Sequence, residues 1–487
     1  MPKRKEKDSQ GTETASKPTR SPTRTSPKPI QINPQHVDTI VRSVVAKNNW
    51  KYKLDSLTPK WMSECDSQGI SEASVTTAFE ILEEIKRDGM GGKSCCGECE
   101  SAQNKKKRKS YYGDTICNCP CSSCALHQDV GVPKSVCQIH DNLIPESLRE
   151  RLKEELAVFE NVSDDQKDWH PNSNQQVLDL VHPSLYCYVG KESQFKDTVN
   201  NKEDFDHDVT YQWLPTEFMV DGDGQVKNLS YINNIDEIKH AKLNKVICEI
   251  LSLFHKPFNT FGDLCEKKFQ VIVKAANIIV TPERCYYPGG TWHTEGLNEN
   301  IVASGIYYYH AENIKESFLE FRENITDDEV EDIDNAQEAF NEFGLQPGDF
   351  MVRKLGSVET KQDRCIVFPN TYQHRVKHFF SADISKPAIR KILVFFLIDP
   401  NDPIISTTEI DVQRLDYLFN RYFSMIKLLP YHLVKYIIQF LPHLTLKQAK
   451  EHREKFMEER KYVVEEQNEE YEREFELRER EFSLCEH

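Results

Sequence analysis

Two histidines and a glutamate have the residue types and spacing of a metal site. His293 and Glu295 are separated by one residue in the segment Tyr286–Gly296, and side chains two positions apart on an extended strand share a face. His374, which follows the buried-looking strand Cys365–Pro369, supplies a third ligand. Two histidines and a carboxylate leave positions on Fe(II) open for a bidentate 2-oxo acid and O2, as in non-haem oxygenases.

One arginine lies where it could bind the second carboxylate of such an acid. Arg390 opens a strand whose apolar run, Ile392–Ile398, indicates burial. Because a guanidinium can bind a carboxylate through two parallel hydrogen bonds, we predict that Arg390 binds the distal carboxylate of 2-oxoglutarate. Lys391 should then point to the opposite face of the strand. A lone His-x-Glu pair is weak evidence for a metal site, and the later histidine and arginine strengthen it.

These residues need a fold that brings distant strands together. An antiparallel double sheet does so, and we predict an α+β fold with a double-stranded β-helix core, jelly-roll or cupin-like, surrounded by helices. The core domain is expected over residues 143–403, with a helix at Leu243–Phe254 and a strand at Phe269–Val280. An acidic helical insertion is expected at 315–343, either a solvated surface excursion or a lid.

The C-terminal residues 404–487 predict a helical extension. Apolar residues recur at helical spacing over Leu415–Phe440. A charged helix should follow, because Thr445 and Gln448 have the spacing of a capping box. This helix is a candidate docking element for a protein partner.

The N-terminal third divides into three parts. Residues 1–35 have almost no large apolar side chains and predict a disordered basic tail, and residues 36–90 predict a small helical region. Residues 91–142 are rich in cysteine, and two Cys-x-x-Cys pairs favour a structural zinc ion. A loop of reactive thiols is the alternative. The proposed zinc ligands are Cys96, Cys99, Cys121 and Cys124.

Composition limits the compartment and the partners. Hydrophobic residues make up 38% of the chain and charged residues 29%, with no apolar run long enough to cross a bilayer and no signal-peptide pattern at the N-terminus. We expect a protein of the cytoplasm or nucleus without a membrane partner. The formal net charge of -16 opposes nucleic-acid binding by the main domain, although basic runs at Pro2–Lys5 and Lys105–Lys109 resemble nuclear-import signals.

Several further sequence blocks are distinctive. They are Asp168–Pro171, Val177–Pro183, Gln212–Pro215, Ser230–Asn234, Lys274–Ile278, Trp292–Asn298, Ile306–Asn313 and Ala449–Glu454. Together with the segment around His374, these blocks resemble an uncharacterised eukaryotic family catalogued as domain of unknown function 4246. The resemblance extends over about residues 140 to 460.

The resemblance implies an oxygenase-like barrel and gives no substrate. Glu295 stands where better-known 2-oxoglutarate oxygenases have aspartate, and a longer acidic side chain can still bind iron. The leading hypothesis is an enzyme that uses Fe(II), 2-oxoglutarate and O2 to hydroxylate a protein or a small molecule. A non-catalytic interaction scaffold and a cupin-type metal dioxygenase that does not use 2-oxoglutarate are the alternatives.

Overall fold

The computed structural model describes residues 135–190 and 210–476, apart from 283, 285, 332, 334, 384, 427 and 428. It also describes the shorter stretches 36–37, 40, 61–65, 67–87, 108–109, 115–116 and 132–133. Residues 1–35 and the predicted zinc ligands Cys96, Cys99, Cys121 and Cys124 lie outside the described residues. The zinc site therefore stays a prediction.

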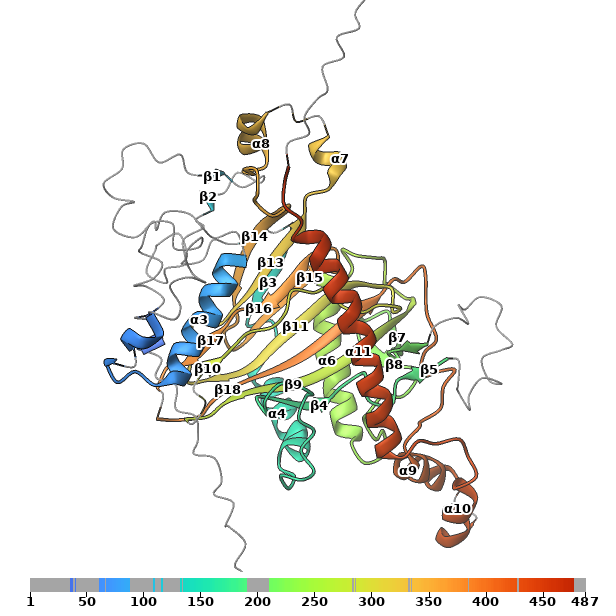
Figure 1. Ribbon diagram of the computed structural model, residues 1–487. Coiled ribbons are helices and arrows are strands. Elements are labelled where there is room, and N and C mark those ends of the chain that lie inside the picture. Colours follow the sequence, from blue (N-terminus) through green and yellow to red (C-terminus); the bar gives the residue numbers. More distant parts are fainter. Residues whose placement is uncertain are drawn as a thin grey trace, which may run out of the picture.

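A large antiparallel sheet forms one wall of the barrel (Figure 1). Its strands, in spatial order, are β3 (Gln138–Asp141), β15 (Arg364–Pro369), β11 (Ile301–Glu312), β18 (Ala388–Ile398), β9 (Lys268–Val280), β7 (Thr216–Val220) and β8 (Val226–Asn228), and β4 (Val177–Val181) also pairs with β9. The predicted strand Phe269–Val280 corresponds to β9.

Strand β18 shows why this sheet lies at the centre of the molecule. Its continuous apolar run is buried on both faces, as expected for a strand covered on two sides. Leu393 and Phe395 point to one hydrophobic cluster, and Val394 and Phe396 point to the other. The strand thus separates two core layers.

Two helices cover the outer layer, α4 (Glu146–Glu160) and α6 (Ala241–Phe258). The predicted helix at Leu243–Phe254 lies within α6, whose buried side chains contact the sheet. Gly305 on β11 allows this close approach, since a Cβ atom there would lie 2.7 Å from the ring of Phe258 and 2.8 Å from that of Phe254. A larger residue at 305 would push α6 off the sheet.

Two three-stranded antiparallel sheets accompany the large one. Residues of β13 and β14 and the segment leading into β16 join the second core layer with Val394 and Phe396 of β18, so two sheets enclose that layer. This is the predicted α+β double-stranded β-helix. The two smaller sheets are β14 (Val352–Glu359), β13 (Phe318–Asn324) and β16 (Gln373–Val376), and β10 (Tyr286–Tyr287), β17 (Phe379–Ser381) and β12 (Ile314–Lys315).

The acidic segment expected at 315–343 differs from the prediction at its start. Residues 318–324 form the central strand β13 of a small sheet, where Leu319 and Phe321 are buried. The surface excursion begins later, with α7 (Asp327–Val330) and α8 (Ala336–Glu342). The glutamates of β13 concealed the strand in the sequence because their charges gave the whole stretch an acidic, solvated composition.

The C-terminal extension is helical, as predicted. It contains α9 (Leu415–Met425), α10 (Tyr431–Ile438) and α11 (Leu446–Tyr471). The capping box is present, because the Thr445 hydroxyl accepts a hydrogen bond from the Gln448 amide at 3.2 Å and Gln448 Oε1 accepts one from the Thr445 amide at 3.0 Å. Helix α11 lies across the barrel strands (Figure 1), and its Phe456 is buried in the second core layer.

The remaining elements are short or peripheral. Helix α3 packs through its cluster of apolar side chains against Tyr286 of β10. No helix among the described residues is both long and apolar enough to cross a membrane. The other elements are α3 (Glu72–Arg87), β1 (Arg108–Lys109), β2 (Thr115–Ile116), β5 (Tyr188–Val189) and β6 (Tyr211–Gln212).

Candidate metal centre

The backbone brings the two predicted histidine ligands side by side. His374 is the second residue of β16, and His293 lies in an extended segment that follows β10. The amide of His293 donates to the carbonyl of His374 at 3.2 Å, and the amide of His374 donates to the carbonyl of His293 at 2.9 Å. The expected strand at His293 is therefore an isolated bridge.

Glu295 completes a compact group of three side chains. Its Oε1 atom lies 3.7 Å from Nε2 of His293 and 3.4 Å from Nε2 of His374. One ligand atom from each side chain lies within 4.8 Å of the other two. Two imidazole nitrogens and a carboxylate oxygen in this arrangement suit a divalent transition metal.

Burial and mutual contacts set the charges of the group. Burial raises the pKa of Glu295, but hydrogen bonds and charge interactions with His293 and His374 outweigh it and hold that pKa well below its ordinary value. Burial and the charge of His293 lower the pKa of His374. Glu295 is thus ionised. Burial lowers the pKa of His293, but the hydrogen bond and charge of Glu295 outweigh it and raise that pKa, so metal binding would displace a proton from this imidazole.

A pair of hydrogen bonds clamps the backbone of Glu295. The Glu295 amide donates to Oδ1 of Asn370 at 2.8 Å, and Nδ2 of Asn370 donates to the Glu295 carbonyl at 2.7 Å. Asn370 lies between β15 and β16, in the segment that leads to His374. No sequence pattern predicts this clamp, because it needs two segments that are distant in the chain to be adjacent.

Arg390 faces the barrel interior and is almost inaccessible to solvent, with 1% exposure. One guanidinium nitrogen, Nη1, donates to the hydroxyls of Ser317 at 2.7 Å and Thr360 at 3.0 Å. Its Nε has no hydrogen-bond partner, and no carboxylate among the described residues forms an ion pair with it. Burial lowers the pKa of Arg390. A buried cation without an anion is costly, so this site favours an anionic ligand.

The neighbouring lysine confirms the orientation of the strand. Lys391 points to the opposite face, where it forms an ion pair with Glu160 of α4. Arg390 shares its face with Ile392 and Val394, which contact the core layer between the sheets. The ring of His374 packs at 4.8 Å against Phe368 of that layer. Arg390 and His374 therefore face one interior.

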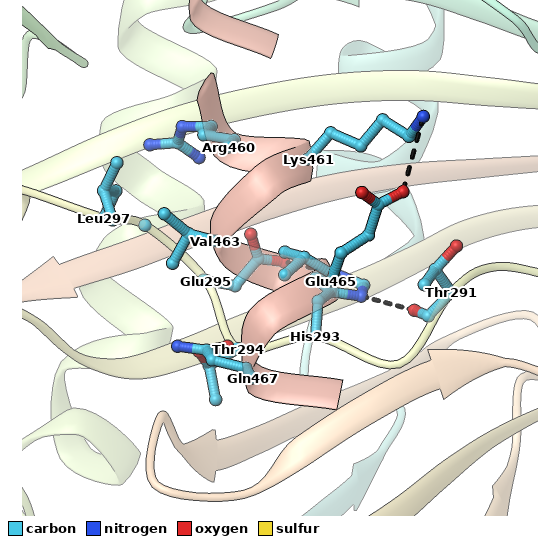
Figure 2. A pocket seen from close by; sticks show the side chains of 12 residues that line it. Thr291, His293, Thr294, Glu295, Leu297, Arg460, Lys461, Val463, Glu465 and Gln467 are labelled. Atoms are coloured by element: carbon cyan, nitrogen blue, oxygen red, sulfur yellow. Dashed lines mark hydrogen bonds and ion pairs between the residues drawn. The ribbon is translucent and has the colours of Figure 1, made fainter. Parts of the chain in front are cut away.

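A cavity of about 370 Å³ opens beside His293 and Glu295. Figure 2 shows the segment Thr291–Leu297 on one side of it and helix α11 on the other. The residues that α11 contributes are Arg460, Lys461, Val463, Val464, Glu465 and Gln467. The sequence did not predict that α11 would form part of the site.

A second group, His170, Asp179 and His182, also has metal-ligating side chains within 4.8 Å of one another. Nδ1 of His170 lies 2.9 Å from Oδ2 of Asp179. The Ser184 amide donates to Nδ1 of His182 at 3.2 Å, so the proton of this neutral ring is on Nε2, the nitrogen nearer the carboxylate. With no lone pair facing Asp179, His182 is a poor ligand, and a hydrogen-bonded network explains the group.

The chain belongs to the family described as Protein of unknown function (DUF4246), whose model matches residues 124–264 and 260–421. Family membership agrees with the resemblance found in the sequence. Helix α11 begins after the last matched residue. No match was found among curated proteins.

Solved structures with similar folds share little sequence with this chain. IDO from Bacillus thuringiensis has a TM-score of 0.30 and 9% identity, over 54% of this chain and 90% of its own. A Pseudomonas putida prolyl-4-hydroxylase has a TM-score of 0.23 and 9% identity, over 54% and 92%. A prolyl hydroxylase from Trichoplax adhaerens has a TM-score of 0.26 and 10% identity, over 55% and 86%. The strand pairing of this chain defines its fold independently of these scores.

Proposed function

We propose that this protein is a non-haem Fe(II)/2-oxoglutarate-dependent dioxygenase, with iron held by His293, Glu295 and His374. The observation that carries the proposal is that these three side chains and a buried arginine face the same barrel interior. The guanidinium of this residue, Arg390, has no carboxylate partner among the described residues. The enzyme needs both a metal and a dicarboxylic co-substrate, and the two features match these needs.

The donor set fits Fe(II). Three protein ligands on one side of the ion leave the remaining positions for a 2-oxo acid and O2. When bound there with 2-oxoglutarate and O2, Fe(II) supplies the oxidising chemistry that hydroxylates a C–H bond, with succinate and CO2 as co-products. Nε2 of His293 and Nε2 of His374 both face Oε1 of Glu295.

The chain's own residues bind the co-substrate and exclude water. Arg390 binds the distal carboxylate of 2-oxoglutarate, and the hydroxyls of Ser317 and Thr360 orient the guanidinium. The aromatic rings of Phe321 and Phe368 pack around His374 and keep that side of the site dry. A substrate reaches His293 and Glu295 through the cavity beside α11.

The test is binding of Fe(II) and 2-oxoglutarate without oxygen, followed by succinate release when O2 is admitted. Wild type is compared with His293→Ala and Arg390→Ala, and Lys391→Ala is the matched control because its side chain lies on the opposite face. We expect wild type and the control to bind both compounds and release succinate, His293→Ala to lose iron, and Arg390→Ala to lose 2-oxoglutarate alone.

Two other outcomes would replace the proposal. Iron binding without 2-oxoglutarate binding would favour a cupin-type dioxygenase that uses no 2-oxo acid. Binding of neither compound would favour a non-catalytic scaffold, for which the exposed outer face of α11 remains a candidate docking surface. Residence in the cytoplasm or nucleus and a structural zinc ion stay predictions.

A further inference from the structure

We infer that helix α11 is part of the metal centre and that Asn468 is a positioning residue for both histidine ligands. This inference rests on the proposed function, because it assumes that His293 and His374 bind the metal. It goes beyond the family match, which ends at residue 421 before α11 begins. It also gives the charged C-terminal helix a role within its own chain.

Asn468 joins the two segments that carry the histidines. Its Nδ2 donates to the carbonyl of Trp292 at 3.1 Å, and its Oδ1 accepts from Nε2 of Gln373 at 3.2 Å. Trp292 directly precedes His293, and Gln373 directly precedes His374. One carboxamide on α11 therefore holds the residue before each histidine ligand.

A buried arginine reinforces this connection. Arg322 of β13 is 2% exposed, and its Nη2 donates to Oδ1 of Asn468 at 2.8 Å. Its Nε donates to Oε1 of Gln373 at 2.7 Å, and its guanidinium lies 4.7 Å from the ring centre of Trp292. A second contact with the helix runs from Nη1 to Glu472 at 3.3 Å. Arg322 thus contacts both histidine-bearing segments and α11.

Burial makes the helix necessary to this network. Gln373 is fully buried and Arg322 almost so, and Asn468 and Glu472 accept hydrogen bonds from them. Without these acceptors, both side chains would lose hydrogen-bond partners in a buried setting, which is unfavourable. Docking of α11 against the barrel supplies these acceptors. The docked helix then holds the backbone of Trp292 and the side chain of Gln373, the residues next to the bridge between His293 and His374.

Residues that orient metal ligands change metal affinity when they are replaced, typically by tenfold to a hundredfold. Asn468 contacts the residues next to the histidines rather than the histidines themselves, so we expect the lower end, about a tenfold loss for Asn468→Ala. Glu469→Ala is the matched control, because Glu469 is the next residue of the same helix and is exposed. It should bind metal as wild type does.

The experiment measures two quantities on the full-length chain. The first is Co2+ affinity by calorimetric titration, with His293→Ala giving the background from other sites. The second is hydrogen exchange of the His293 and His374 amides in the metal-free protein. For Asn468→Ala we expect weaker Co2+ binding and faster exchange at both amides, with unchanged exchange in α6 and β9 on the far side of the barrel.

A second variant separates a local role from a global one. Asn468→Asp keeps the oxygen that accepts from Gln373 and Arg322 but loses the donor to Trp292. The increase in exchange rate should then be larger at the His293 amide than at the amides of β16, which pairs with β13. Uniformly faster exchange across the barrel in either variant would show a merely structural role and overturn the inference.

The outcomes also separate this inference from the proposed function. If wild type binds Co2+ above the His293→Ala background and Asn468→Ala matches wild type in affinity and exchange, the positioning role is wrong and the metal site stands. If wild type shows no binding above that background, the metal site is wrong and the inference about ligand positioning fails with it.

Discussion

The backbones of His293 and His374 are hydrogen-bonded to each other in both directions, at 3.2 and 2.9 Å. This bridge sets the separation of the two imidazoles through the main chain. The ring centres are 4.5 Å apart. Glu295 is fixed by a different pair of bonds, from Asn370. Hydrogen bonds to the main chain therefore position all three candidate ligands.

The length of the Glu295 side chain should affect metal affinity, because Asn370 restrains the Glu295 backbone. Glu295→Asp would withdraw the carboxylate by about 1.5 Å, one C–C bond, while Asn370 keeps the backbone in place. We expect Co2+ affinity about tenfold below wild type, although aspartate is the usual residue in related sites. Calorimetric titration measures this. Wild-type affinity in Glu295→Asp would show that the clamp yields easily.

Removing the buried charge of Arg390 should have opposite effects on stability and on ligand binding. In Arg390→Met the cost of burying an unpaired cation disappears, and the hydroxyls of Ser317 and Thr360 keep their mutual hydrogen bond at 2.8 Å. We expect the Tm of the ligand-free protein to rise by about 3 °C. Affinity for 2-oxoglutarate should fall about a hundredfold. Calorimetry measures both.

A lower Tm in Arg390→Met would contradict this prediction, because it would show that the two hydroxyls and the rings of Tyr308 and Phe379 already stabilise the guanidinium. Lys391→Met is the control. It breaks the ion pair with Glu160 on the opposite face and should lower the Tm without changing 2-oxoglutarate affinity.

The ion pair beside Trp292 should make stability depend on pH. Burial raises the pKa of Glu320, but Lys377 and Arg375 outweigh it and lower this pKa from 4.5 to about 2. A carboxyl group with a lowered pKa stabilises the fold fully above its ordinary pKa and loses that contribution as the pH falls toward the folded value. The stabilising effect should therefore decline between about pH 5 and pH 2.

Glu320→Gln tests this dependence. We expect the variant to be about 2 kcal/mol less stable than wild type at pH 7, and the difference to shrink to less than half by about pH 3. Urea unfolding across this range measures it. A difference that stays constant with pH would show that packing, rather than charge, explains the loss. Arg375 would still lie over the ring of Trp292, at 4.4 Å from its centre.

The sequence was sufficient for the parts of the site that follow from strand geometry. The spacing of His293 and Glu295 predicted that their side chains share a face, and the structure brings them together with His374. The apolar run after Arg390 predicted a buried strand, and Arg390 is buried. The opposite orientation of Lys391 followed from alternation along the strand. These predictions depend on local periodicity, which a single sequence contains.

The missed features depend on contacts between distant segments. For example, Tyr308 of β11 faces Arg390 of β18, whereas its neighbours Tyr307 and Tyr309 pack in the outer core layer. Nothing in a charged C-terminal helix predicts which residues it contacts. One signal was available, because Arg453 and Arg460 are seven residues apart and both point inward, to Asp168 and Glu299. Residues at this spacing share one face of a helix, which allows both arginines to reach carboxylates of the barrel.

The glycine before the first ligand gives a last prediction, with a matched control. Gly289 has φ of +96°, and a Cβ atom there would lie 2.9 Å from the carbonyl oxygen of Val376. Gly224 has φ of +77° with nothing within 4 Å of a Cβ atom. Both alanine variants carry the strain of a positive φ, about 1 kcal/mol. Gly289→Ala also forces β16 away and should lose about 3 kcal/mol in total.

Affinity for a metal ion should distinguish these two variants. The Gly290 amide donates to the Val376 carbonyl at 2.9 Å and ties the segment that leads to His293 to β16. A Cβ atom at Gly289 would disturb this bond, so Gly289→Ala should weaken Co2+ binding, whereas Gly224→Ala, in a distant turn, should not. Urea unfolding and Co2+ titration of both variants measure the effects. Equal losses of stability and unchanged Co2+ affinity in both would show that the segment between β10 and His293 adapts to the added methyl group.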